Sequence, residues 1–299
     1  MRLSILLTVF LLSVGSGSAK DASALCEAVE AGDVATAQKL LAEGAGIESR
    51  NDKGWTPLIV AANATNAEMA KLLIEKGADV NAKSSSAIGS TVLCFATQSD
   101  DPKFIDLFLQ HGATLNARSK NGATPLYAAV AKKKENATKF LISKGAKVDQ
   151  LAFLNERGRL WTPLMSAAED GDLHLTELLM ASGASLEKRN NWGETVLMHV
   201  ARLPESEMIR FLVKRGANVN AKTPDGHTAL IYAANAGETE NVRVLLAAGA
   251  DPNARWSDSN YLDEPGHDAT FYPGINHDEE TVVLIREAQR KSNQDVSKH

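Results

Sequence analysis

A short element of the form Thr-x-Leu returns at nearly constant intervals along the chain, and this periodicity constrains the fold more than any other feature. Six copies are separated by 35, 33, 38, 33 and 33 residues, and a Gly-Ala pair keeps the same register in seven copies. Such self-similarity indicates an array of small units that pack only on their neighbours. A domain count taken from the length of 299 residues therefore does not apply. The copies begin at Thr56, Thr91, Thr124, Thr162, Thr195 and Thr228, and the glycines are Gly44, Gly77, Gly112, Gly145, Gly183, Gly216 and Gly249.

Each copy carries residues suited to begin, fill and end a pair of helices. Thr can cap the first helix through its hydroxyl, and the Pro that follows it in several copies fits the first helical position. Alanine pairs such as Ala61 and Ala62 let neighbouring first helices approach closely. An apolar doublet before each Gly-Ala pair predicts a buried second helix, and the glycine suits the left-handed residue at which a helix stops. Counting back 33 residues from Thr56 gives Ser23-Ala-Leu25, an altered first copy.

These motifs resemble the ankyrin-repeat family over about residues 21–255, since Thr-Pro-Leu is part of that family's hallmark Thr-Pro-Leu-His-x-Ala. The resemblance implies an all-α fold: an ankyrin-repeat solenoid of stacked helix-turn-helix units with β-turn fingers. The chain departs from the family at the His position, which suggests more apolar packing between repeats. That position holds Cys26, Ile59, Cys94, Tyr127, Met165, Met198 and Ile231.

Two loops are longer than the others. From the glycine of one copy to the next motif Thr is normally 12 residues, but it is 14 after Gly77 and 17 after Gly145. The second insertion, residues 150–160, contains apolar residues. It either folds back on the array or is offered to a partner, because exposed loops carry function yet exposed apolar groups usually find cover.

Both ends of the chain differ from the array at 20–255. Residues 1–19 combine Arg2, a short apolar run and small residues, which is typical of a signal peptide cleaved after Ala19. We therefore expect a protein that is periplasmic or secreted and has no membrane span after cleavage. Because the signal segment is compact, we expect a bacterial source. Residues 256–299 are expected to form a capping segment with a loop over 256–277, one helix at about 278–290 and a frayed end.

Charge and motif content exclude several function classes. The 32 basic and 37 acidic residues give a net charge of −5, whereas nucleic-acid-binding domains usually carry a positive excess. No phosphate-binding loop, nucleophile elbow or zinc-protease helix occurs. His267-Asp268 and His277-Asp278 match no metal motif, so we expect no enzyme, no cofactor and no metal. Cys26 and Cys94 sit two copies apart, too distant for a disulfide, and are expected to be buried.

The tryptophans indicate where a partner would bind. All four fall at or near the turns between helix pairs and are therefore expected to avoid the core. The resemblance implies that variable turn positions contact a bound protein. Tryptophan is also a favoured interface anchor. The alternative is that each ring covers its neighbouring turn. The predicted partner-binding residues are Lys53, Trp55, Lys120, Arg159, Trp161, Asn191, Trp192, Glu194, Asp225, His227 and Trp256.

The sequence therefore predicts a monomeric, non-enzymatic module that binds another protein through a concave face and its fingers. Two alternatives stay open. The module could be an inhibitor or immunity protein against a toxin enzyme, or the tail after Arg255 could hold an enzymatic or metal site.

Overall fold

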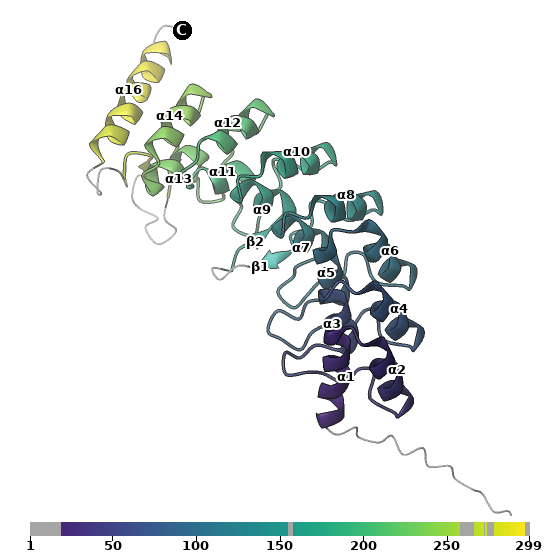
Figure 1. Cartoon of the computed structure of the whole chain (residues 1–299). Coiled ribbons are helices and arrows are strands. Elements are labelled where there is room, and N and C mark those ends of the chain that lie inside the picture. Colours follow the sequence, from purple (N-terminus) through teal and green to yellow (C-terminus); the bar gives the residue numbers. More distant parts are fainter. Residues whose placement is uncertain (1–18, 155–157, 258–265, 272, 274–277, 297–299) are drawn as a thin grey trace, which may run out of the picture.

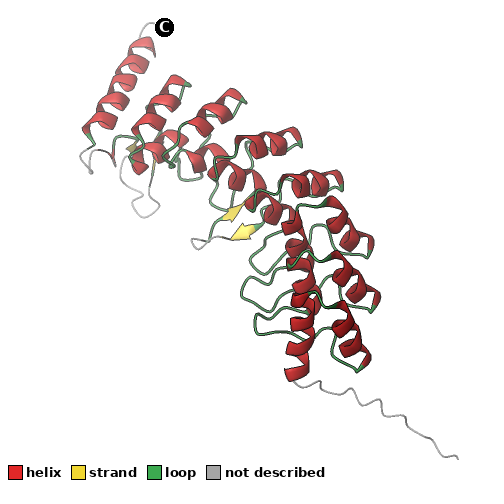
Figure 2. Ribbon diagram, in the orientation of Figure 1, coloured by secondary structure: helices red, strands yellow, loops and turns green. Residues whose placement is uncertain are grey.

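The computed structural model describes residues 19–154, 158–257, 266–271, 273 and 278–296, whose helices stack in pairs along one curved array (Figure 1). The loops that join one pair to the next project on a single side of the stack, as Figure 2 shows, and are called fingers below. The predicted solenoid of helix pairs is confirmed. The pairs are α1 (Ala19–Ala31) with α2 (Val34–Ala42), α3 (Pro57–Asn63) with α4 (Ala67–Glu75), α5 (Val92–Ala96) with α6 (Pro102–Gln110), α7 (Pro125–Ala131) with α8 (Glu135–Ser143), α9 (Pro163–Glu169) with α10 (Leu173–Ala181), α11 (Val196–Val200) with α12 (Glu207–Lys214), and α13 (Ala229–Ala236) with α14 (Thr239–Ala247).

The motif residues act at the helix ends as the sequence predicts. In all six copies the Thr hydroxyl accepts a hydrogen bond from the amide three residues ahead, at 3.1–3.4 Å. The glycines of the seven Gly-Ala pairs have φ between 87° and 93°, the left-handed region in which a side chain is strained. Each repeat therefore starts and stops its helices with the same local chemistry.

A continuous apolar core runs through the array from Leu25 to Ile285. The seven residues at the family's His position are all buried, with relative exposures of 0–7%. The expected apolar packing at this position is confirmed. Cys26 and Cys94 are free and buried, and burial raises the pKa of the Cys26 thiol to about 11.

Polar side chains in the fingers bind the backbone of the next repeat. The Asn81 amide accepts from the Thr114 N–H at 2.8 Å and donates to the Gly112 carbonyl at 3.0 Å. Arg50 donates to the Lys83 carbonyl at 2.8 Å, 33 residues further along the chain. These bonds satisfy loop carbonyls and amides that no helix or strand would pair, and they fix the spacing of successive fingers.

The C-terminal segment is more ordered than the sequence predicts. Instead of a plain loop after residue 255, β3 (Arg255–Trp256) pairs antiparallel with β4 (His267–Asp268). The helix α16 spans Glu279–Val296 and so continues past residue 290, where the sequence predicts a frayed end. Its length has a physical reason, because its second half contacts the last finger: Gln289 donates to the Pro252 carbonyl at 3.0 Å. Residues 258–265, 272, 274–277 and 297–299 lie outside the described residues, as do 1–18 of the expected signal peptide.

One strained backbone position gives a stability prediction. The residue nine places after the motif Thr is left-handed in several repeats. It is glycine at Gly171 and Gly237 but Thr65 in the second repeat, where φ is 54°. We expect Thr65→Gly to raise the free energy of unfolding by about 0.5–1 kcal/mol, because a side chain in this region is strained. Urea denaturation of the full chain measures the change.

The matched control is the preceding residue. Ala64 has an ordinary helical φ of −77°, so Ala64→Gly should destabilise the chain by about 0.5–1 kcal/mol. Equal effects of the two glycines would contradict the strain at Thr65.

Candidate functional site

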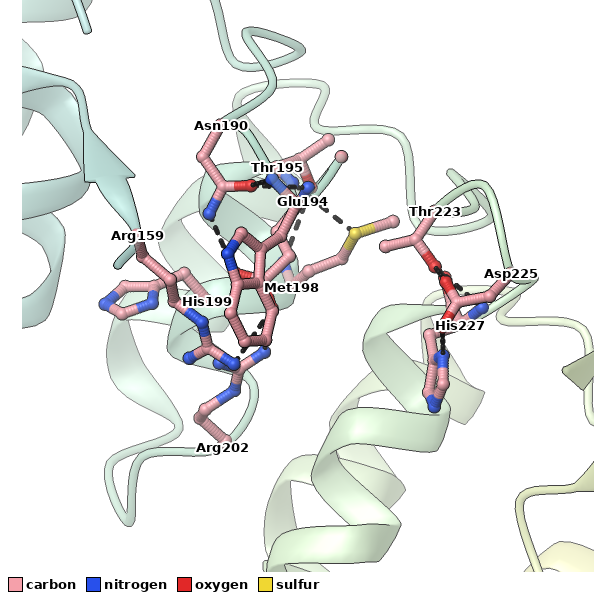
Figure 3. A network of polar contacts seen from close by, with 12 residues as sticks. Arg159, Asn190, Glu194, Thr195, Met198, His199, Arg202, Thr223, Asp225 and His227 are labelled. Atoms are coloured by element: carbon pink, nitrogen blue, oxygen red, sulfur yellow. Dashed lines mark hydrogen bonds and ion pairs between the residues drawn. The ribbon is translucent and has the colours of Figure 1, made fainter. Parts of the chain in front are cut away.

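The central group of the candidate site is the Glu194 carboxylate, which is 0% exposed although it lies in a finger. Arg202 Nη2 is 2.9 Å and Arg159 Nη2 3.5 Å from Glu194 Oε1. Asn190 Nδ2 donates to Oε2 at 2.8 Å. Figure 3 shows the two guanidinium groups next to each other beside this carboxylate. Charge-assisted hydrogen bonds of this kind are strong and hold their partners in fixed orientations.

Each arginine also stacks on an aromatic ring. The Arg159 guanidinium carbon lies 4.4 Å from the centroid of Trp192, and that of Arg202 lies 4.2 Å from the centroid of Tyr232. Both distances fall in the range of cation–π contacts. Glu194 therefore fixes two arginines that in turn orient two rings. We call Arg159, Trp192, Glu194, Arg202 and Tyr232 the Glu194 cluster.

The charges of the cluster shift its titrations. Burial raises the pKa of Glu194, but the Arg202 charge, the hydrogen bonds from Arg202 and Asn190, and Arg159 outweigh it, so the pKa lies below its ordinary value. Burial and the adjacent Glu194 carboxylate raise the pKa of the Tyr232 hydroxyl. The cluster thus carries an ionised carboxylate and a neutral phenol at neutral pH.

The second insertion brings Arg159 to this cluster. Its strands β1 (Phe153–Leu154) and β2 (Leu160–Trp161) pair antiparallel. Asn191 of the next finger holds the turn, because its side chain accepts from the Leu160 N–H at 2.7 Å and donates to the Gly158 carbonyl at 2.9 Å. Trp161 packs edge-on against His199 of α11, with ring centroids 4.7 Å apart. The described part of the insertion therefore folds back on the array.

A second group of aromatic side chains lies on the C-terminal side of the Glu194 cluster and contacts it through Tyr232. The His227 ring stacks on Tyr232 at 5.1 Å and on Trp256 at 4.5 Å, and His267 stacks on Phe271 at 3.8 Å. Asp225 Oδ2 lies 2.9 Å from His227 Nδ1. Burial raises the pKa of Asp225, but the hydrogen bond from Thr223 and the neighbouring His227 hold it below its ordinary value.

The remaining predicted residues lie nearer the N-terminus. Trp55 is half-buried and packs edge-on against Phe95 with centroids 5.0 Å apart. Lys53 lies 5.2 Å from the Trp55 centroid and 3.7 Å from Glu30. Lys120 is exposed, and its Nζ lies 3.4 Å from the Ser86 carbonyl. None of these contacts involves a residue of the Glu194 cluster.

Two of the predicted partner-binding residues are buried, which corrects the prediction for them. Trp256 is 6% exposed, because the β3–β4 hairpin and Phe271 cover its ring, so the expectation that all four tryptophans avoid the core is wrong. Glu194 is buried under its arginines and is not an exposed contact. Trp192, by contrast, is 47% exposed. For the other predicted residues, partner contact stays a prediction.

Sequence reasoning missed three residues that shape this face, namely Arg202, Tyr232 and His199. A signal was present, because His199 and Tyr232 occupy the same place, four residues after the motif Thr. Phe95 occupies it too. Large rings at one fixed position of a repeat mark the side chains that line the finger side of the first helices.

Comparison with known proteins agrees with a helical repeat protein. The chain matches the family model described as "Ankyrin repeats (3 copies)" over residues 6–84, 83–152 and 161–255. It belongs to the ankyrin-repeat family.

The similar proteins include large multidomain relatives. The chain is 30% identical over 143 residues to the Ankyrin repeat and KH domain-containing protein mask-1 of Caenorhabditis elegans, an alignment that covers 48% of this chain and 5% of that protein. It is 40% identical over 55 residues to the human Ankyrin repeat, SAM and basic leucine zipper domain-containing protein 1, covering 18% of this chain and 12% of that one. The chain thus spans a small part of these relatives' length.

Two solved structures share the fold. The ankyrin repeat domain of human ASB11 is 26% identical with a TM-score of 0.62, covering 76% of this chain and 98% of that domain. The ankyrin repeat domain of Bcl-3 is 24% identical with a TM-score of 0.62, covering 75% and 97%.

Within the described ranges, no three His, Cys, Asp or Glu residues gather where they could hold a metal ion. Among the described helices, none is both long and apolar enough to cross a membrane.

The pKa of Glu194 leads to a prediction of stability. Glu194→Gln should lower the free energy of unfolding at pH 7 by about 2 kcal/mol, because it removes charge-assisted hydrogen bonds and leaves two arginines without their carboxylate. A group whose folded pKa is depressed stabilises the fold above its unfolded pKa of about 4.3. The difference in the free energy of unfolding between wild type and Glu194→Gln should therefore be complete near pH 6. It should disappear as the pH falls through the lower folded pKa of Glu194.

Urea denaturation across this pH range provides the measurement, and Glu205→Gln is the matched control. Glu205 is an exposed carboxylate that makes no ion pair or side-chain hydrogen bond with another described residue, so its change should stay within about 0.5 kcal/mol at every pH. A wild-type advantage over Glu194→Gln that is the same at pH 3 and pH 6 would contradict the depressed pKa.

Proposed function

We propose that this chain is an exported, monomeric and non-catalytic module that binds a partner protein through its fingers and first helices. The observation that carries the proposal is Trp192, whose ring is 47% exposed and yet held in place. Arg159 stacks on it at 4.4 Å, and Arg159 is itself bound to the buried Glu194.

This arrangement suits binding for an energetic reason. An exposed aromatic side chain with a fixed orientation loses little conformational freedom when a partner covers it. Tryptophan and arginine are enriched among the residues that dominate interface energies. The ankyrin array supports the same proposal, because stacked repeats hold a long surface rigid without a ligand.

Site-specific photo-crosslinking tests the binding surface. A benzophenone amino acid is placed at Trp192 in one chain and at Lys71, an exposed residue of the outer helix α4, in a matched control. We expect a crosslinked partner from the Trp192 position alone. Mass spectrometry then identifies it. Crosslinks from Lys71 and none from Trp192 would contradict the proposal.

The purified partner then gives a quantitative test. Trp192→Ala should weaken its binding at least tenfold, as the loss of a central anchor does. The melting temperature should change little, because nearly half of this ring faces solvent. Isothermal titration and circular dichroism measure the two effects.

Export is the part of the proposal that depends on residues 1–19. The apolar run from Leu3 to Val14 supports export, and it lies outside the described residues. Intact mass measurement of the protein from its native cells should give a chain that begins at Lys20. Leu7→Arg should interrupt the apolar run and leave the full-length chain inside the cell. An unprocessed wild-type chain would contradict export.

A further inference from the structure

Some repeats fill the finger side of the array with a ring that directly precedes the motif Thr. Trp55 and Trp161 hold this position, and each packs against the residue four places after the Thr of the next repeat. The pairs are Trp55 with Phe95 at 5.0 Å and Trp161 with His199 at 4.7 Å. His227 holds the position in the seventh repeat and stacks on Trp256 at 4.5 Å.

Two neighbouring repeats lack this ring. The residue before the motif Thr is Ser90 in the third repeat and Ala123 in the fourth, and Ala128 stands four places after Thr124. Small side chains at these positions leave a groove of about 330 Å³ on the finger side, between α5 and α7. Its lining includes Ile88, Phe95, Ala123, Tyr127, Ala128 and Lys132.

The groove is apolar and yet open to solvent. Ile88, which lines it, is 51% exposed and is one of three exposed large hydrophobic side chains among the described residues. Phe95 receives Trp55 on its edge and also lines the groove. The groove therefore lies next to the Trp55–Phe95 pair, at the place where the third and fourth repeats supply no ring of their own.

One end of the groove carries positive charge. Lys132 lines it, and no described lining residue is acidic. Among the described residues Lys132 makes no ion pair, whereas the charge of Lys133 acts on Asp170 of the fifth repeat, where it opposes the rise in pKa that burial causes. An occupant of the groove would meet an apolar floor and a cationic end.

We propose that the groove receives an aromatic side chain of the partner protein, from a segment with acidic residues next to that aromatic. The ring would take the place that Trp55 and Trp161 fill in their own repeats. The acidic neighbours would meet Lys132. This inference rests on the proposed function, since it names the chemistry of the partner at a second surface, in repeats three and four.

A synthetic peptide provides the probe. We use the fluorescein-labelled sequence Gly-Ser-Glu-Asp-Trp-Asp-Glu-Ser-Gly and the full-length processed chain, and follow anisotropy at low salt. Saturable binding is expected, with at least a tenfold loss when the peptide Trp is replaced by Ala or its acids by Lys. Binding should also weaken with added salt, because exposed charges are screened.

A variant in which a side chain fills the groove gives the decisive test. Ser90→Trp copies the ring of the neighbouring repeats at the position that faces Ala128, and it should weaken peptide binding at least tenfold while the circular dichroism and melting stay close to wild type. Ala181→Trp, at the exposed end of the outer helix α10, is the matched control and should bind as wild type does. Lys132→Glu should reduce binding without filling the groove.

Several results would overturn the proposal. These are no saturable binding of the peptide, equal binding by Ser90→Trp, and equal binding of the peptide with lysines. Self-association of the wild-type chain that Ser90→Trp abolishes would assign the groove to a second copy of this chain. None of these results bears on crosslinking at Trp192, so the groove can fail while the proposed function stands.

Discussion

The contact between neighbouring helix pairs is the interaction on which the whole structure depends. A single pair of helices of seven to nine residues, such as α3 and α4, is too short to be stable alone. Each pair buries its apolar face only against the pairs before and after it. The last pair needs a cover as well, and α16 supplies it: the Thr281 and Thr239 hydroxyls lie 2.8 Å apart. Stability therefore accumulates along the array and has no single centre.

This constraint divides the residues of each repeat into two classes. The cap threonine, the alanine pair and the terminal glycine recur because every interface needs them. The residues just before the Thr and four places after it face the finger side, and stacking leaves them free to vary. Large rings there give the row from Trp161 to Trp256, and small residues at Ala123 and Ala128 give the groove. Departures from the repeat, and not the repeat itself, give this chain its particular surface.

The same division explains what the sequence could predict. The helix starts, the glycine ends and the buried residue at the family's His position are local or periodic features, and the structure confirms them. The burial of Glu194 is neither. It depends on Arg159, carried in by an insertion, and on Arg202, which lies eight residues further on in the next loop. Trp256 is buried because β4, eleven residues away, pairs with its strand. Periodicity carries no information about such non-repeating contacts.

The length of α16 was unpredictable for a related reason. A helical pattern that weakens after Ala288 gives no reason for the helix to continue. Contacts with the last finger supply that reason, through Gln289 to the Pro252 carbonyl and Asn253 toward Ser292 at 3.4 Å. Asn81 and Asn220 make the equivalent contacts to the next repeat. The C-terminal cap is thus held by the same kind of asparagine hydrogen bond that joins ordinary repeats.

A nearest-neighbour array also sets how the two binding surfaces can act together. The groove lies in the third and fourth repeats, and the Glu194 cluster in the fifth to seventh. Changes at distant, independent sites are usually additive, so the two surfaces should contribute separately to the binding energy. A rigid scaffold nevertheless fixes their separation. In the proposed binding mode, a partner held at Trp192 would present its next segment to the groove at a high effective concentration. Each contact could then be weak by itself, and specificity would come from the spacing that the stacked repeats impose.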